Sequence, residues 1–253
     1  MALDPDQVAA YLARLGIDHA PSPDADGLRR LQAAHLRRIP FENLDIHLGI
    51  PITLEVDRLV DKIVTRQRGG FCYELNGAFA ALLSTLGFSV LLHEARVHDG
   101  GVLGIPFDHL CLQVQLDEPY LVDVGFGACF DEPLRLLPGV QQHDPAGVFE
   151  IVDSGDGLDL LQDSSPQYRF FPAPRRLADF VDACSFHQTS PESHFTRNTV
   201  CSIRTDDGRV TIRGTELLET RGAERTERLL APDELVDAYR RYFGVALDGP
   251  IGS

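Results

Sequence analysis

Residues 68–76 read Arg68-Gly-Gly-Phe-Cys-Tyr-Glu-Leu-Asn76 and form the most informative segment of the chain. The two glycines permit a tight backbone turn, and apolar residues then recur at helical spacing as far as Leu86, with Gly87 after them. We therefore predict a helix that begins at about Cys72. Unpaired N–H groups and the positive end of the helix dipole gather at such a position, so the pattern predicts a thiol with a lowered pKa. The same segment also suits a buried structural cysteine.

Two strand-like segments offer the partners that a cysteine nucleophile needs, an imidazole to take its proton and a carboxylate to orient that imidazole. His109 begins the most regular predicted strand, and Asp123 lies in an apolar strand where an unpaired carboxylate would be costly. A hairpin turn centred on Leu116 would place the two residues opposite each other. A turn centred on Asp117-Glu118 would offset them by about three residues. The sequence leaves this register open.

The hydrophobic period changes twice along the chain. Apolar residues recur at helical spacing through residues 1–87, alternate within short strands through 88–190, and belong to a mixture of strands and a final helix through 191–253. This order predicts an α+β fold with three parts divided at those positions. The mixed charges of residues 216–228 indicate a solvated surface. The predicted strands are 89–97, 109–116, 120–125, 148–152, 158–161, 168–171, 199–204 and 209–213.

The composition excludes several classes of protein. The 253 residues include 38 acidic and 23 basic side chains, and a net charge of −15 disfavours binding to nucleic acid or to anionic membranes. No apolar run approaches the ~20 residues of a membrane span. The amino terminus carries acidic residues ahead of any apolar stretch, unlike a signal peptide. Five cysteines without a CxxC pair then favour reduced thiols, and we expect a cytoplasmic protein.

A zinc site is the only metal site that the cysteines and histidines suggest. Cys184, His187, His194 and Cys201 lie within a short window, but their spacing lacks the close cysteine pairs of structural zinc sites. We therefore predict no metal ligands.

Several motifs together resemble the arylamine N-acetyltransferases, over roughly residues 35–200. Besides residues 68–76, they are Arg38-Ile-Pro-Phe-Glu-Asn-Leu-Asp45, the His109-Leu110 pair, Val122-Asp-Val-Gly-Phe-Gly127 and Ser190-Pro-x-Ser-x-Phe195. Five motifs in this order are highly specific, whereas each alone is weak. The resemblance implies a papain-like fold with a helical bundle at 1–87, a β-barrel at 88–190 and a small α/β lid at 191–253.

The resemblance also implies the roles of individual residues. Cys72 would be the nucleophile, His109 the base and Asp123 the carboxylate that orients the histidine. Further residues would line the substrate sites: Phe41, Val97, Phe126 and Phe195 the acceptor pocket, and Gly125 and Gly127 the coenzyme A site. Flat aromatic amines suit a pocket of phenylalanine rings, although each ring also suits an ordinary core position. Because no acidic residue is evident among these rings, we expect neutral arylamines to be preferred over protonated alkylamines.

The implied activity is acyl transfer through a cysteine thioester. Acetyl-coenzyme A would be a co-substrate rather than a bound cofactor, and the acceptor would be an aromatic amine or hydrazine. Ala128 stands where the family often has glycine, and the stretch between Val97 and His109 is short. These departures leave open an amide synthase of the ansamycin type, which takes its acyl group from a carrier protein and closes a macrolactam. A papain-like peptidase shares the triad chemistry, but usually has a secretion signal and disulfides that are not evident here.

Overall fold

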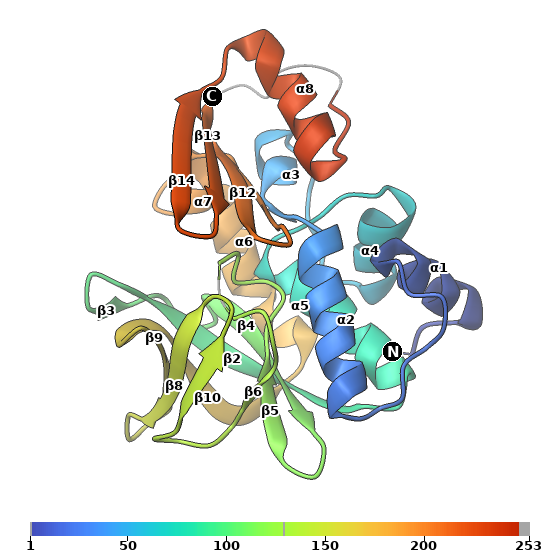
Figure 1. Ribbon diagram of the computed structural model, residues 1–253, viewed down its shortest axis with the longest axis vertical. Helices are drawn as coiled ribbons and strands as arrows, with labels where there is room; N and C mark the ends of the chain where they lie inside the picture. The colour runs from blue at the N-terminus through green and yellow to red at the C-terminus, as the bar shows by residue number, and fades with distance from the viewer. Residues whose placement is uncertain (1, 129, 248–253) are drawn as a thin grey trace.

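The computed structural model describes residues 2–128 and 130–247, so Cys129 lies outside the described residues. The helices of the first third pack beside a curved sheet, and a second sheet with one covering helix lies above both (Figure 1). The helices are α1 (Pro5–Leu15), α2 (Ala25–Arg38), α3 (Leu44–His47), α4 (Val56–Val60), the π-helix η1 (Asp61–Thr65), α5 (Cys72–Thr85), the 3₁₀ helix η2 (Leu177–Phe180), α6 (Val181–Thr189), α7 (His194–Arg197) and α8 (Pro232–Phe243).

Helix α5 is the centre of the helical part. Its residues are buried from Cys72 to Leu83, because it packs against other helices on one side and against strands on the other. A helix that is apolar all round is stable only when it is surrounded in this way. The expected helix start at Cys72 is confirmed, and the residue therefore sits at a fixed point in the core.

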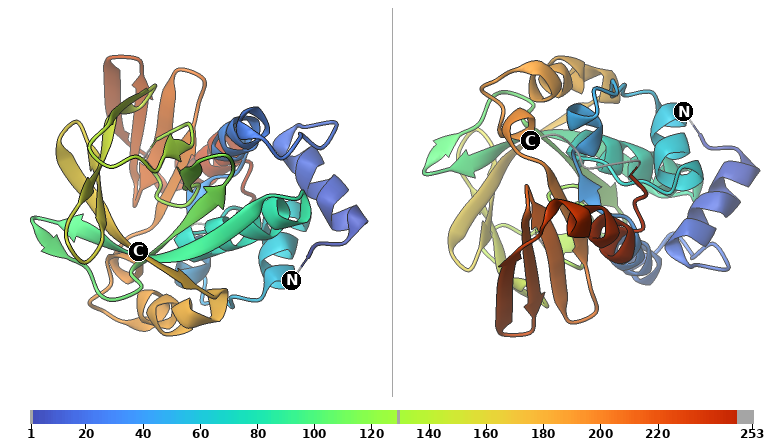
Figure 2. Two further views of the ribbon diagram at one scale, coloured as in Figure 1. Left: turned by 90° about the horizontal axis from the view of Figure 1, so that it is seen from below. Right: turned by 90° about the horizontal axis from the view of Figure 1, so that it is seen from above.

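The larger sheet is antiparallel and has the strand order β6-β5-β4-β2-β10-β9-β8-β7, with β3 paired to β2. Its strands are β2 (Ser89–Asp99), β3 (Val102–Leu103), β4 (His109–Gln115), β5 (Pro119–Val122), β6 (Leu134–Arg135), β7 (Gln141–Asp144), β8 (Gly147–Asp153), β9 (Leu158–Gln162) and β10 (Ser165–Arg175). The sheet curls upon itself (Figure 2), and the side chain of Gln142 on one edge strand bonds both the N–H and the C=O of Arg135 on the other. These two bonds nearly close the sheet into a barrel.

The smaller sheet has the order β1-β11-β12-β13-β14, and all its pairings are antiparallel. Its strands are β1 (Phe41–Glu42), β11 (Val200–Arg204), β12 (Gly208–Arg213), β13 (Glu216–Arg221) and β14 (Glu224–Leu229), and α8 packs on one of its faces. Strand β1 comes from the first third of the chain. Its pairing with β11, in which Phe41 lies opposite Ser202, therefore ties the helical part to this sheet. The three-part division itself stays a prediction.

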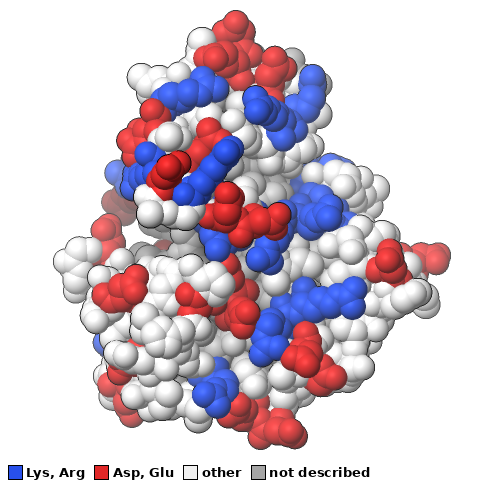
Figure 3. All heavy atoms as spheres, in the orientation of Figure 1, with Lys and Arg blue, Asp and Glu red and all other residues white. Residues whose placement is uncertain are grey.

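Most predicted strands are present, but the interpretation of residues 216–228 is incomplete. They form β13 and most of β14, and every residue of β14 is exposed. The edge strand carries charged residues such as Arg225 and Glu227, which keep it in solvent. Because both of its faces are polar, its sequence lacks the alternation of apolar and polar residues that predicts a strand. Acidic and basic side chains are interspersed over the face in Figure 3, so the excess of acidic residues forms no single continuous patch there. No helix of the described chain has both the length and the apolar character of a membrane span.

Candidate active site

A glycine pair holds the segment before Cys72 close to β1. A Cβ on Gly69 would collide with the carbonyl of Pro40, and Gly70 accepts a hydrogen bond from the N–H of Glu42 at 2.9 Å. Cys72 then occupies the first position of α5, where intrahelical bonding leaves N–H groups without partners. The turn therefore places the Cys72 thiol beside unpaired backbone N–H groups at the start of α5.

His109 and Asp123 form a buried pair. His109 Nε2 lies 2.7 Å from Asp123 Oδ2, and the two residues are 2% and 1% exposed. The other carboxylate oxygen, Oδ1, accepts hydrogen bonds from Asn76 Nδ2 at 2.9 Å and from the N–H of Gly125 at 2.8 Å. The carboxylate is fully satisfied, which is what its burial requires.

Asn76 joins the three segments that carry Cys72, His109 and Asp123. It lies four residues after Cys72 and so on the same face of α5. Its amide also donates to the carbonyl of Leu110 at 2.6 Å and accepts from the N–H of Val124 at 3.0 Å. Asn76 therefore connects Leu110, Asp123 and Val124 through one side chain.

The pKa of the Cys72 thiol is raised, so the prediction of a lowered value is wrong. Burial is the largest cause, and the carboxylates of Asp108 and Asp123 add to it, while a backbone hydrogen bond from Leu110 works in the opposite direction. The N-terminus of α5 does not outweigh this desolvation. The thiol therefore needs a base to take its proton.

A cavity of about 480 Å³ brings the expected site residues together. Its wall includes Cys72, His109, Phe41, Val97, Phe126, Phe195, Gly125 and Gly127. It also includes residues that the sequence did not identify, among them Asp108, His194, Arg209 and Arg213. Asp123 lies behind His109 and is not part of the wall.

Aromatic rings lie against the imidazole and line the cavity. Phe126 meets the His109 ring edge to face, with centroids 5.2 Å apart, and Phe41 lies 6.1 Å from Phe195. The two glycines have different surroundings. A Cβ on Gly125 would lie 2.8 Å from Cys72 Cα, whereas Gly127 has a φ of +89° and faces the Phe41 ring. Gly125 therefore permits the close packing of its loop on Cys72.

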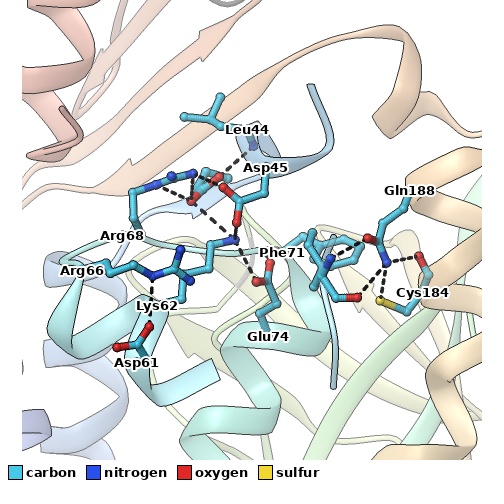
Figure 4. A network of polar contacts seen from close by, with 12 residues as sticks. Leu44, Asp45, Asp61, Lys62, Arg66, Arg68, Phe71, Glu74, Cys184 and Gln188 are labelled. Carbon is cyan, nitrogen blue, oxygen red and sulfur yellow. Dashed lines mark hydrogen bonds and ion pairs between the residues drawn. The ribbon is translucent and has the colours of Figure 1, made fainter. Parts of the chain in front are cut away.

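A buried cluster of charges lies beside the segment that ends at Phe71 (Figure 4). Lys62, the only lysine of the chain, is 3% exposed and lies 2.8 Å from Glu74 and 2.9 Å from Asp45. Arg68 pairs with Glu42 and Asp45 at 2.8 and 2.9 Å. Glu74 Oε2 accepts the N–H of Phe71, directly before Cys72. Arg68 and Glu74 are therefore parts of one buried cluster that supports the segment before Cys72.

The residues considered for zinc have other partners. His187 lies between Asp108 and Ser193, Gln188 contacts the Cys184 sulfur, and Cys201 lies in the core of the smaller sheet. Within residues 2–128 and 130–247, no group of three histidine, cysteine or acidic side chains is arranged to hold a metal ion.

Comparison with known proteins agrees with this geometry. A family model described as N-acetyltransferase matches residues 24–251. The arylamine N-acetyltransferase of Mycolicibacterium smegmatis is 38% identical over 263 residues, which cover 98% of this chain and 94% of the relative. Human arylamine N-acetyltransferase 1 is 32% identical, with 79% of each chain covered.

Solved structures give the same result. The M. smegmatis arylamine N-acetyltransferase has a TM-score of 0.90 at 35% identity, covering 97% of this chain and 93% of that one. The Mycobacterium marinum arylamine N-acetyltransferase, solved in complex with CoA, has a TM-score of 0.87 at 34% identity, covering 94% and 92%. These matches confirm the predicted α+β fold and the resemblance seen in the motifs. The chain is an acyltransferase and belongs to the arylamine N-acetyltransferase family.

Proposed function

We propose that this enzyme moves an acetyl group from acetyl-coenzyme A to an aromatic amine or hydrazine, with Cys72 as nucleophile, His109 as base and Asp123 as the orienting carboxylate. The observation that carries the proposal is the buried contact between His109 and Asp123 beside a cavity that also contains Cys72. A satisfied carboxylate behind an imidazole fixes its tautomer and stabilises its protonated form.

The first half-reaction acylates the enzyme. His109 takes the proton of the Cys72 thiol, and the thiolate attacks the thioester carbonyl. The tetrahedral oxyanion is held by backbone N–H groups at the start of α5, including that of Cys72. Collapse breaks the bond from carbon to sulfur, coenzyme A leaves with a proton, and an acetyl thioester remains on Cys72.

The second half-reaction transfers the acetyl group. The amine nitrogen attacks the Cys72 thioester, His109 removes a proton from the attacking nitrogen, and the Cys72 thiol is released as the amide forms. The rings of Phe41, Phe126 and Phe195 hold the aromatic acceptor by offset or edge-to-face contacts. Val97 completes this side of the cavity.

The donor site has a positive wall. Arg209 and Arg213, both on β12, line the cavity that contains Cys72. In a protein of net charge −15, arginines at this position favour binding of the coenzyme phosphates, which guanidinium groups hold well. We place the donor between this wall and the Gly125–Gly127 loop.

The runner-up activity is a macrolactam-forming amide synthase fed by an acyl carrier protein. The relatives described above are arylamine N-acetyltransferases, which favours acetyl-coenzyme A as donor. A dedicated cyclase would be slow or inert with acetyl-coenzyme A and a simple aniline. We also propose a cytoplasmic location, supported by the reduced state of the four described cysteines.

Intact-mass spectrometry tests the proposal. Incubation with acetyl-coenzyme A should add one acetyl group to the protein and release free coenzyme A, and peptide mapping should find the group on Cys72. Addition of aniline should then remove it. Cys72→Ser serves as the matched control and should gain no acetyl thioester. An intact enzyme that stays unmodified, or that is acetylated elsewhere, would exclude this mechanism.

A further inference from the structure

The cavity contains a carboxylate that the proposed reaction does not use. Asp108 directly precedes His109, its side chain is 12% exposed, and it lies on the cavity wall. The sequence-based expectation that no acidic residue borders the acceptor site is therefore wrong.

Both oxygens of Asp108 are fixed in place. Oδ1 lies 3.0 Å from His187 Nε2, and Oδ2 accepts the N–H of Val97 at 3.1 Å. Oδ2 also lies directly against Gly104, where any Cβ would collide with it. The orientation of this carboxylate is thus set by three separate elements of the structure.

The second ring nitrogen of His187 also has a partner. Its Nδ1 lies 3.0 Å from Ser193 Oγ, and both residues are only 2% exposed. Ser193 Oγ accepts the N–H of Phe195, so its own proton is available to Nδ1. In that tautomer the proton is on Nε2, which lies 3.0 Å from Asp108 Oδ1 in an electrostatic contact without the alignment of a hydrogen bond. The resulting Ser193–His187–Asp108 chain orients the carboxylate, and Ser193 is too deeply buried to act as a nucleophile.

Asp108 is ionised at neutral pH. Burial alone would raise the pKa of its carboxyl, but the contact with His187, the Val97 N–H and the nearby His109 lower it below its usual range. Its charge is also felt at the reaction centre, since it contributes to the raised pKa of Cys72. His194, on the same wall, has a pKa lowered by burial and by His187, so it stays neutral.

We propose that Asp108 is an acceptor-specificity residue: its carboxylate accepts a hydrogen bond from a hydroxyl or amino substituent on the ring of the arylamine and repels an anionic substituent. This inference rests on the proposed function of the same cavity. A hydrogen bond to a charged acceptor in a partly buried site is strong enough for about a tenfold or larger preference. An aromatic carboxylate would be repelled by the negative charge of Asp108. It also has no proton to donate to Asp108.

Two pairs of matched acceptors test the inference. In the first pair, 4-aminobenzamide should have a kcat/KM at least about tenfold above that of 4-aminobenzoate, although the amide withdraws more electron density from the amine. In the second pair, 3-aminophenol should exceed 3-methoxyaniline, which has a similar electronic effect but no donor. In the Asp108→Asn variant, both ratios should move towards one, mainly through KM.

A matched variant controls for the loss of one negative charge. Asp182 is exposed on α6, the helix that carries His187. Asp182→Asn should keep both acceptor ratios of the unmodified enzyme. If Asp182→Asn shifts them as much as Asp108→Asn does, general electrostatics rather than Asp108 sets the preference.

The outcomes separate this inference from the proposed function. If the unmodified enzyme acetylates aniline but treats 4-aminobenzoate and 4-aminobenzamide equally, the role of Asp108 is refuted and the proposed function stands. The same holds if Asp108→Asn leaves both ratios unchanged. The ratios of the unmodified enzyme also decide the matter if Asp108→Asn does not fold. If no arylamine is acetylated, the proposed function itself fails.

Discussion

His109 Nε2 lies 2.7 Å from Asp123 Oδ2, although the pairing of β4 with β5 does not place the two residues opposite each other. Leu112 pairs with Val122, so continuation of this register would put position 125 opposite His109. The offset of two residues keeps both side chains on one face of the sheet, because side chains alternate with period two. An offset of three would have separated them.

Asp123→Asn should reduce acetyl transfer by about 10⁴, the factor measured in the analogous serine triad. Both Asn76 and Gly125 donate to Asp123 Oδ1, so the oxygen of the new amide will stay there and its NH₂ group will face His109. His109 Nε2 must then accept, which places the ring proton on Nδ1 and removes the base that Cys72 needs. Steady-state assays with aniline and acetyl-coenzyme A measure the loss.

The same variant should unfold in urea at nearly the same concentration, because the new amide is isosteric and its hydrogen bonds are retained. That result would separate a catalytic from a structural loss. Near-normal turnover by Asp123→Asn would remove Asp123 from the mechanism.

The sequence predicts the triad better than it predicts the support around it. The position of Cys72 follows from local helix signals, and the strands that carry His109 and Asp123 follow from their alternating pattern. The register between those strands depends on the hairpin turn, where Leu116 N–H bonds the Glu118 carbonyl. A turn of this kind has no decisive sequence signal, and the observed offset of two residues lies between the two predicted alternatives.

Asn76→Ala should lower both stability and activity. The substitution leaves the Leu110 carbonyl and the Val124 N–H without partners in the core, at about 1–3 kcal/mol for each buried group. It also removes one of the two donors that hold Asp123 Oδ1. Urea unfolding and kcat with aniline measure the two effects.

Gln32→Ala provides the matched control for Asn76→Ala. Gln32 is equally buried and donates to the Asp131 carbonyl at 3.2 Å, and neither residue lines the cavity. It should lose stability while keeping kcat. If both variants lose activity only in proportion to their stability, Asn76 has no positioning role.

Cys72 should be the first cysteine to react with iodoacetamide. Burial raises the pKa of every described cysteine that shows a shift, to about 12 for Cys184 and well above the usual value for Cys201. Cys72 differs from the other described cysteines because it lines the cavity with His109. Peptide mapping after brief labelling identifies the modified residue.

Loss of the base should slow that labelling. His109→Ala should reduce the alkylation rate of Cys72 by about 10² or more, because no other group takes the thiol proton. Cys184→Ser should leave the rate unchanged. Faster labelling of Cys184 or Cys201 in the unmodified enzyme would contradict the assignment of the nucleophile.

Glu74→Gln should flatten the dependence of stability on pH. Burial raises the pKa of Glu74 to about 7 in the folded protein, against the attraction of Lys62. Between the unfolded and folded pKa values the native state binds more protons, so the free energy of unfolding falls as the pH rises from about 4.5 to 7. This fall amounts to up to about 3 kcal/mol, which Glu74→Gln should remove.

Urea unfolding at pH 5 and pH 8 measures that difference. Glu132→Gln is the control, because Glu132 is half exposed in its pair with Arg29 and should leave the pH dependence unchanged. An identical pH dependence in the unmodified enzyme and in Glu74→Gln would show that the carboxyl of Glu74 titrates normally.

The buried charges around Glu74 also show where sequence reasoning stops. Lys62 lies within a helical pattern and carries the charge typical of a surface position, yet η1 directs it inward to Asp45 and Glu74. Asp108 likewise contacts a partner, His187, that is distant in sequence. Pairs of this kind depend on the packing of separate segments, and no local pattern marks them.

Acceptor basicity should dominate the choice of amine, even though Asp108 can attract a cation. A lysine-like amine with a pKa of about 10.4 is neutral in only about one molecule in 10³ at neutral pH. An ammonium ion bound by Asp108 has no lone pair to attack the Cys72 thioester. Deprotonation inside the apolar cleft would add the loss of its hydration. An arylamine arrives neutral, with its lone pair available and a ring that fits against phenylalanine.

The isomers 4-methylaniline and benzylamine make this comparison at constant size. At pH 7, acetylation of 4-methylaniline should be faster by about 10² or more, because so little benzylamine is neutral there. The benzylamine rate should rise about tenfold for each pH unit until the amine is neutral, while the rate for 4-methylaniline should follow only the titration of the enzyme. Equal rates at pH 7, or a benzylamine rate independent of pH, would mean that the enzyme deprotonates its acceptor before attack. The aromatic cleft would then select by shape alone.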